Sequence, residues 1–340
     1  MINKMPATAV PKLDICSTIV DNLIERLRNA VSIRVQSIRC VPTSSKITPR
    51  VAVLFSGGLD CSLLARLSHE LLPLEQQIEL VNVAFENPRI TKLTSRSMGS
   101  DSFASCPDRL TGLKSFQELQ QVCPNRHWRF IAVNVPYIEY LEHRPLIVRL
   151  IFPHETEMDL SIASALYFAA RGRGYTSGPE GGVPTLHTAI ARVLLSGFGA
   201  DELFGGYTRH AMAFARKGHA GLVDELELDF ERIGSRNLGR DDRVIAHWAR
   251  EVRYPFLDED LVRWVLRLPT WQKCGYEFDT DSRGDPDKMS LDAAKLGLRL
   301  AAWKLGIKGA ASERKRAIQF GARTAKMESG RTRGTQTLRI

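Results

Sequence analysis

A short run of small, polar and acidic residues has the composition of a phosphate-binding loop. The string FSGGLDCS occupies residues 55–62, with Ser56, Gly57 and Gly58 near its start and Asp60 after them. Glycines let a backbone approach phosphate oxygens closely, and the free N–H groups of a helix N-terminus attract negative charge. A carboxylate at Asp60 would repel bare phosphate, but it can hold a Mg²⁺ ion that bridges the phosphates. The pattern therefore predicts a site for a metal-bound phosphate chain.

Two other phosphate-binding patterns do not match this string. A Walker loop ends in Gly-Lys-Ser/Thr and a dinucleotide-binding loop carries GxGxxG, and residues 55–62 contain neither. A tight strand-to-helix turn without a ligand remains the alternative. The complete string, placed directly after a strand, favours phosphate over that alternative.

The elements around the string place it at the edge of a parallel sheet. VAVLF at 51–55 is an apolar β-branched run typical of a buried strand, and the residues after the glycines are typical of a helix. Strand, glycine turn and helix form the first unit of a βαβ sheet, so the fold class is α/β, with a mostly helical C-terminal half. Further strands are expected at 78–85, 128–135 and 191–197, a polar surface excursion at 86–113, and helices at 15–32, 114–122, 157–171, 207–216, 221–233, 257–267 and 290–305.

Four strings resemble the sequence blocks of one enzyme family, and they occur in the family's order. SGGLD at 56–60 is similar to the signature of the ATP pyrophosphatases, which have the Rossmann-like adenine-nucleotide alpha-hydrolase fold and cleave ATP to AMP and pyrophosphate. LLSGFGADELFGGY at 194–207, REVRYPFLD at 250–258 and KRAIQFGAR at 315–323 resemble the later blocks of the asparagine synthetases. RNLGRDDR at 236–243 and the QFGAR ending resemble the eukaryotic branch of asparagine synthetase domain-containing proteins. The resemblance is specific and covers most of the chain.

The resemblance implies a ligase reaction. In this family ATP and aspartate form β-aspartyl-AMP with loss of pyrophosphate, and ammonia then attacks the acyl-adenylate. Charge gathers on the leaving pyrophosphate, so the reaction needs a cation beside it. We therefore expect an enzyme that uses ATP and Mg²⁺ with an aspartate-like acid and a nitrogen donor.

The resemblance also assigns roles to individual residues. Asp60 and Asp201 match the family's magnesium-binding aspartates, and Lys315 matches the lysine that reaches the phosphates. A helix cap is the alternative for Asp201, and a solvated charge is the alternative for Lys315. Glu251 is a candidate active-site acid. The residues matched to nucleotide contacts are Leu54, Ser56, Gly57, Gly58, Asp60, Ser62, Val83, Ser196 and Gly197, of which Leu54 and Val83 are core strand residues in any case.

Two positions depart from the family pattern. The second block usually reads SGEGADE, with a glutamate that serves acyl transfer as a base or orienting group, and Phe198 stands at that position. Phenylalanine accepts no proton, so general-base assistance of roughly 10²–10⁴-fold would be missing. Cys61 stands where the family's loop has serine. A nucleotide-binding interaction protein that has lost synthesis is therefore a second hypothesis. A tRNA-modifying ATP pyrophosphatase is a third, against which the absence of CxxC counts.

The segment before the first strand is short. Glutamine-dependent asparagine synthetases begin with a glutaminase domain whose nucleophile is an N-terminal cysteine, whereas this sequence begins MINKMP and its first cysteine is Cys16. About 50 residues cannot hold such a domain, so a separate or missing glutaminase is expected. The expected organisation is an N-terminal segment with one helix at 1–48, a synthetase-like domain at 49–325 and a basic tail at 326–340.

Composition and charge limit the location and the partners. The chain has 340 residues, 44% hydrophobic and 25% charged, with no apolar run of membrane-spanning length and no apolar signal-peptide core. Six scattered cysteines without CxxC favour a reducing compartment, so a cytoplasmic location is expected. Of the net charge of +9, residues 314–340 carry +7, from eight basic residues and one acid. The excess belongs to a tail that is expected to be solvated, so a nucleic-acid partner is not expected.

Overall fold

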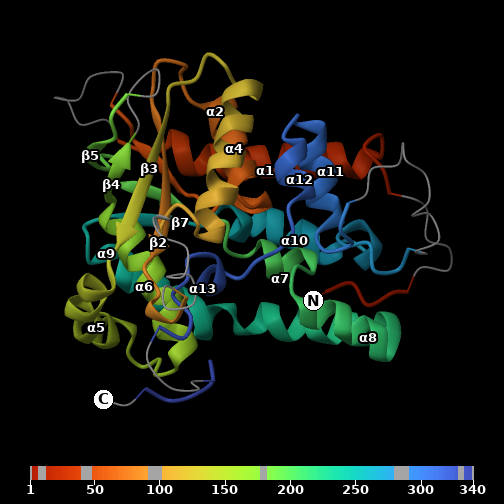
Figure 1. The fold of residues 1–340 in the computed structure, drawn as a ribbon. Coiled ribbons are helices and arrows are strands. Elements are labelled where there is room, and N and C mark those ends of the chain that lie inside the picture. Colours follow the sequence, from red (N-terminus) through yellow and green to blue (C-terminus); the bar gives the residue numbers. More distant parts are fainter. Residues whose placement is uncertain are drawn as a thin grey trace.

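A seven-stranded, mostly parallel sheet forms the centre of the computed structural model (Figure 1), which describes residues 2–6, 13–39, 48–90, 102–176, 182–278, 291–327 and 333–338. The strand order is β5-β4-β3-β2-β1-β6-β7. Strands β3 (Trp128–Val135), β2 (Ile78–Phe85), β1 (Val51–Leu54), β6 (Val193–Leu195) and β7 (Glu251–Arg253) run parallel, and β4 (Arg173–Thr176) and β5 (Thr185–Thr188) add an antiparallel edge. The predicted α/β class is confirmed.

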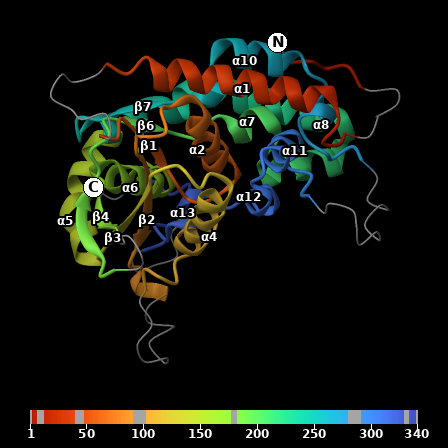
Figure 2. The same cartoon turned by 90° about the horizontal axis from the view of Figure 1, so that it is seen from above.

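Alternate strand residues build a core on each face of the sheet. Val51 and Val53 pack with helices α1 (Thr18–Gln36), α2 (Leu59–Leu71), α10 (Glu259–Arg267) and α11 (Leu296–Lys304). Ala52 and Val81 pack on the other face with α5 (Tyr137–Ile151), α6 (Glu157–Arg171) and α9 (Gly239–Ala246). Helix α1 shares the core of α2 and α11, so the N-terminal segment packs as part of the domain. Seen from above, α8 (Thr208–Ile233) and α11 lie away from the sheet, on the side opposite α5 (Figure 2).

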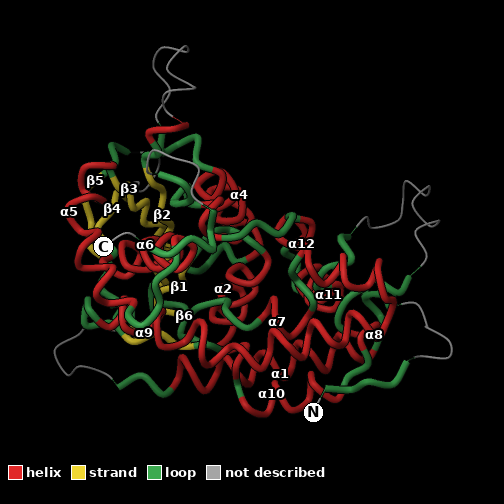
Figure 3. Tube along the Cα trace, turned by 90° about the horizontal axis from the view of Figure 1, so that it is seen from below, coloured by secondary structure: helices red, strands yellow, loops and turns green. Residues whose placement is uncertain are grey.

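The other helices and helical turns connect these layers. They are α4 (Pro107–Val122), α7 (Ala200–Phe204), α12 (Lys308–Ser312), α13 (Ile318–Gly321), the π-helix Gly234–Leu238, and the 3₁₀ turns Pro255–Leu257 and Thr270–Gln272. Figure 3 shows the strands gathered at one side of the molecule and the helices α1, α7, α8 and α10 filling the other. No helix in the described residues is long and apolar enough to cross a membrane.

Several elements differ from the sequence-based expectations. Helix α5 and the strands β4, β5 and β7 were not expected, because α5 carries an internal Pro145 and the three strands are only three or four residues long. Helix α4 begins within the expected surface excursion, of which residues 91–101 lie outside the described part of the chain. The two helices expected at 207–233 form one run, α8, that is interrupted at Gly218.

The C-terminal basic segment is not simply a solvated tail. Within the described residues 333–338, Leu338 is buried and its N–H donates to the Glu155 carbonyl, and Thr337 bridges to Thr156 just before α6. Earlier in the segment, Lys315 and Arg316 line a cavity at the sheet edge. The expectation of a solvated tail was therefore wrong for these parts, because Leu338 packs beside α6 and Lys315 and Arg316 pair with Asp201 and Asp108. The rest of 326–340 lies partly outside the described residues.

Candidate functional site

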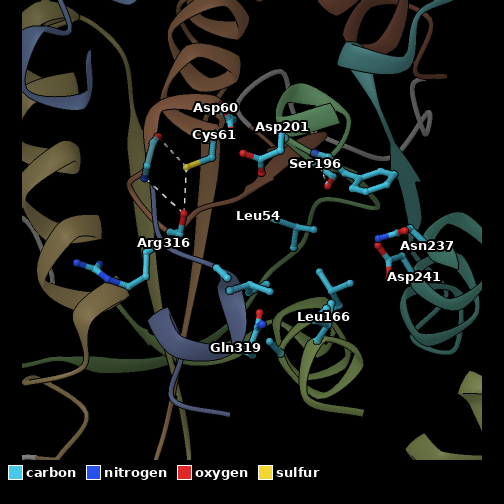
Figure 4. A pocket seen from close by; sticks show the side chains of 18 of the residues that line it. Leu54, Asp60, Cys61, Leu166, Ser196, Asp201, Asn237, Asp241, Arg316 and Gln319 are labelled. Atoms are coloured by element: carbon cyan, nitrogen blue, oxygen red, sulfur yellow. Dashed lines mark hydrogen bonds between the residues drawn. The ribbon is translucent and has the colours of Figure 1, made fainter. Parts of the chain in front are cut away.

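A cavity of about 420 Å³ opens at the carboxyl ends of β1, β2 and β6. Open α/β sheets place ligands at this edge, and the volume is that of a small-molecule site. Figure 4 shows Asp60 and Asp201 near one end of the cavity, Asn237 and Asp241 at the other, and Leu54 between them. Most of the predicted site residues therefore come from distant parts of the chain to one place.

The glycine turn presents backbone to this cavity at Gly58 but not at Gly57. Gly57 has φ +82°, and a Cβ there would lie 2.4 Å from the Thr111 carbonyl oxygen, so this residue faces the backbone of α4. Gly58 lines the cavity, and a Cβ there would meet only Ser56 Oγ at 3.5 Å. No side-chain hydrogen bond caps the N-terminus of the 13-residue helix α2 that follows. The first amides of α2 can therefore serve an anion.

Side chains of the turn hold its shape. Ser62 is fully buried, and its hydroxyl donates to the Gly57 carbonyl, so it supports the loop from behind. The Ser115 hydroxyl donates to the same carbonyl at 2.6 Å. Cys61 Sγ donates to the Gly58 carbonyl, and burial raises the pKa of this thiol to about 11, so it stays protonated. Of the predicted phosphate contacts, Ser56 and Gly58 face the cavity, whereas Gly57 and Ser62 shape the loop.

The middle of the cavity is apolar on both sides. Leu54 and Val83 line it from the sheet, and α6 contributes Ile162, Leu166 and Ala169 from the opposite wall. Ser196 and Gly197 line it from the β6–α7 turn. A Cβ at Gly197 would lie 2.7 Å from Asp60 Cβ, so this glycine lets the two turns meet. A flat apolar group of about the size of adenine can lie between sheet and helix here.

The two predicted metal-binding aspartates meet around lysines. Lys295 Nζ lies 2.6 Å from Asp60 Oδ2 and 2.7 Å from Asp201 Oδ1, and Lys315 Nζ lies 2.9 Å from Asp201 Oδ2. Burial alone would raise the pKa of Asp201, but Lys295 and Lys315 outweigh it and hold this pKa well below its usual value. Burial raises the pKa of Asp60, which has only one of these ammonium groups beside it. Asp201 faces this cluster and does not cap a helix.

The aspartate pair suits magnesium better than a metal held entirely by protein. Among the described residues no group of three or more His, Cys, Asp or Glu side chains gathers to hold a metal. Mg²⁺ is commonly bound by one or two carboxylates together with waters and substrate phosphates. Asp60 Oδ1 is buried without a hydrogen-bond partner among the described residues, so it is an acceptor still open to a cation. The donor set therefore fits Mg²⁺ bound with phosphates.

A second, smaller cavity of about 70 Å³ adjoins the first, and its lining has five basic and three acidic residues, a basic excess. Both cavities share Gly58, Asp60 and Lys315. The small one is also lined by the basic residues Lys295, Arg299, Arg314 and Arg316. Its position at the N-terminus of α2, with several cationic side chains, suits a compact anion such as pyrophosphate.

Glu251 does not reach either cavity. It lies on the edge strand β7, where its side chain is 62% exposed and pairs with Arg253 at 2.6 Å. Edge-strand side chains alternate between faces, and this one points to solvent. The structure therefore gives no support for Glu251 as an active-site acid, and we assign it a surface ion pair.

Several residues of the site carried no signal in the sequence. Lys295 precedes α11 in an ordinary helical pattern, and Asp108 falls in the expected surface excursion. Tyr207 was seen only as part of a matched string, yet its hydroxyl donates to Glu202 Oε1 at 2.6 Å and its ring lies 5.0 Å from Lys315 Nζ. Their roles follow from tertiary contacts alone.

Asp108 makes stability depend on pH. It lines both cavities, and burial raises its pKa to about 7 against the opposing charge of Arg316. An aspartate in the unfolded chain has a pKa of about 3.9. The raised pKa of the folded state therefore contributes its full stability below about pH 3.9, and this contribution is lost as the pH rises through about 7. Asp108→Asn mimics the protonated form. We expect its free energy of unfolding, relative to that of wild type, to be roughly 2–3 kcal/mol higher at about pH 8 than at about pH 5. Urea unfolding at both pH values measures this, and an equal effect at both would contradict it.

Comparisons with known proteins agree with the sequence blocks. The model of a family described as asparagine synthase matches residues 185–224 and 215–277. An asparagine synthetase domain-containing protein of Saccharomyces cerevisiae is 41% identical over 331 residues, which cover 95% of this chain and 56% of that protein. Asparagine synthetase domain-containing protein 1 is 39% identical in Gallus gallus, over 86% of this chain and 49% of that protein. The Homo sapiens protein of the same name is 35% identical, over 96% of this chain and 55% of that protein. The chain thus spans about half the length of these curated relatives.

Proposed function

The chain belongs to the asparagine synthase family, as its sequence blocks predicted, and we propose that it is an ATP-dependent ligase that activates an acid as its acyl-adenylate. The observation that carries the proposal is the meeting of Asp60, Asp201 and the uncapped N-terminus of α2 where an apolar cavity adjoins a small basic one. We further propose that the sheet is of the ATP pyrophosphatase type.

The two cavities divide the nucleotide. Adenine fits between Leu54 and Leu166 in the large cavity, and the β- and γ-phosphates fit the basic cavity beside Gly58. A Mg²⁺ ion held by Asp60 and Asp201 would neutralise charge on the phosphates. Lys315 and Arg316 then stabilise the leaving pyrophosphate, because both line the basic cavity and both are cations. This arrangement leaves the α-phosphate at the junction, facing the rest of the large cavity.

The far end of the large cavity supports an acidic acyl substrate. Arg232, Arg236 and Asn237 line it from α8 and the π-helix, and no ion pair joins either arginine to a described carboxylate. By contrast, Arg240 is buried and paired with Asp159 and Asp241 at 2.7 and 2.8 Å. The unpaired arginines are suited to hold the carboxylate of an aspartate-like acid while its other carboxylate meets the α-phosphate.

The transfer step has no base at the position where the family pattern has one. Phe198 lines the cavity and packs edge-to-face on Tyr254 with ring centroids 5.8 Å apart. Burial raises the pKa of Tyr254 well above its usual value, so its hydroxyl is no base either. A nitrogen donor that arrives as a neutral amine, such as ammonia, needs no deprotonation before attack, and the proton that it sheds afterwards can pass to the departing AMP phosphate or to water. A cytoplasmic location and the source of the amine, including any separate glutaminase, stay predictions.

Pyrophosphate release tests the proposal directly. We expect purified protein with Mg-ATP to release pyrophosphate only when an aspartate-like dicarboxylic acid is added, and to do so less readily with acids that have one carboxylate. Arg236→Gln should raise the acid concentration needed for half-maximal release by roughly 10- to 100-fold, since one charged hydrogen bond is worth about 1.5–3 kcal/mol. Glu251→Gln should match wild type, because that side chain lies outside both cavities.

The second candidate function is nucleotide binding without turnover, and Phe198 is the observation that favours it. Suppose that Mg-ATP raises the unfolding temperature of the protein but that no acid in a panel of mono- and dicarboxylates yields pyrophosphate. The ligase proposal is then rejected in favour of nucleotide binding without turnover. If Mg-ATP neither binds nor stabilises the protein, both fail.

A further inference from the structure

A lysine that the sequence did not single out lies between the two proposed metal-binding aspartates. Lys295 Nζ contacts Asp60 Oδ2 at 2.6 Å and Asp201 Oδ1 at 2.7 Å, and its side chain is only 4% exposed. One ammonium group of the chain thus holds together the two carboxylates that a bridging divalent cation would also hold. The ammonium and such a cation compete for the same two carboxylates, although Lys295 contacts Oδ2 of Asp60 and leaves its Oδ1 open.

The local backbone is shaped to bring Lys295 to this place. Lys295 has φ +58°, a left-handed conformation that costs a residue with a Cβ roughly 1–2 kcal/mol. Its N–H donates to the carbonyl of Phe204, in the helix that carries Asp201. A Cβ at Gly206 would lie 2.3 Å from Lys295 Cε and 2.0 Å from Asp201 Oδ1, so only glycine leaves room for the pair. Unfavourable backbone of this kind persists where surrounding structure maintains it.

The charges of the cluster require a cation at this point. Asp60 and Asp201 are close, only partly exposed and of like sign, so without a cation each would destabilise the charged form of the other. Lys315 pairs with Asp201 but is not within ion-pair distance of Asp60. Among the described residues, Lys295 is therefore the cation that contacts both carboxylates. Lys295 also lines the small basic cavity. It therefore has a second anion within reach when that cavity holds phosphates.

We propose that Lys295 is a tethered cation that neutralises the Asp60–Asp201 pair in the absence of metal and thereby makes divalent-metal binding depend on nucleotide. The inference rests on the proposed metal role of the aspartate pair. A divalent ion alone must displace an ammonium that the fold holds in place. When metal and nucleotide bind together, Lys295 exchanges its carboxylate partners for phosphate oxygens in the adjoining cavity. The new contacts with phosphate then offset the loss of its two ion pairs.

Manganese binding to the nucleotide-free protein tests the proposal. Free Mn²⁺, measured by its paramagnetic resonance signal during a titration, gives an affinity without any need for turnover. We expect wild type to bind Mn²⁺ weakly and Lys295→Met, which keeps the length and removes the charge, to bind it at least tenfold more tightly. Lys304→Met is the matched control, because Lys304 ends the same helix but pairs with the exposed Asp21, and it should behave as wild type. Equal Mn²⁺ affinities in wild type and Lys295→Met would overturn the proposal.

A double variant keeps the test decisive if Lys295→Met does not fold. Lys295→Met/Asp60→Asn removes one charge of each sign, so we expect it to fold and to bind Mn²⁺ no better than wild type. A folded double variant beside an unfolded single one supports charge compensation by Lys295. If neither folds, Lys295 serves packing and the proposal fails.

The outcomes separate this proposal from the ligase reaction. A tenfold gain in Mn²⁺ affinity without pyrophosphate release from wild type would sustain the role of Lys295 and reject the reaction. Pyrophosphate release from wild type without any gain in the variant would do the reverse.

Discussion

Asp60→Asn is expected to lower the Mg²⁺-dependent affinity for ATP by roughly 100-fold, or about 2.7 kcal/mol. The carboxylate lies in the first turn of α2, lines both cavities, and has a buried oxygen without a hydrogen-bond partner among the described residues. The amide keeps the shape of the side chain but removes its charge, so the metal loses a ligand. Lys295 keeps its pairing with Asp201, so the fold should survive the change. Isothermal titration with ATP, in excess Mg²⁺ and in chelator, measures the effect.

The two arms of that titration identify the cause. In chelator the variant should bind ATP as well as wild type or better, because a negative charge beside the phosphates is gone. Asp260→Asn is the matched control, since the same change falls on a side chain that is 82% exposed on α10, and it should leave both affinities unchanged. A loss of equal size with and without Mg²⁺ would mean that Asp60 shapes the loop and does not hold a metal.

Local patterns were sufficient to predict the part of the site that a single segment builds. The strand at 51–54, the turn and the helix from Leu59 follow from β-branched residues, glycines and helical periodicity within about 20 residues. Strings matched by resemblance then added Asp201 and Lys315, which the structure brings to one ion-pair cluster with Asp60. Because these strings lie more than 100 residues apart, no periodicity or propensity of the chain could have joined them.

The residues that were missed depend on tertiary packing. Lys295 enters the site through a backbone conformation that neighbouring elements impose, and Asp108 through the packing of α4 on the loop. The prediction for Glu251 erred in the opposite direction. Its sequence block suggested a place in the site, but its side chain lies on the solvent-facing side of a three-residue strand. Strand faces and left-handed residues are decided by contacts far along the chain, and a sequence window carries little information about either.

Gly57→Ala is expected to destabilise the protein by roughly 2–5 kcal/mol through two separable effects. At φ +82° the new side chain costs about 1–2 kcal/mol of backbone strain. Its Cβ would also lie 2.4 Å from the Thr111 carbonyl oxygen and 2.6 Å from Gly112 Cα, and backbone cannot move aside as a flexible side chain can. Such overpacking adds about 1–3 kcal/mol. Urea unfolding measures the total.

Two other glycines separate strain, overpacking and phosphate binding. Gly218 combines φ +62° with ψ −149°, a region essentially restricted to glycine, and a Cβ there would meet nothing within 4 Å, so Gly218→Ala should show backbone strain without overpacking. Gly58 has an ordinary φ of −70° and lines both cavities, so Gly58→Ala should fold normally and lose affinity for ATP. If Gly57→Ala were as stable as wild type, the loop would not be pressed against α4. The amides of α2 would then lack the rigid support that a preorganised phosphate site requires, because a loop that can yield must be ordered by the ligand itself at a cost in affinity.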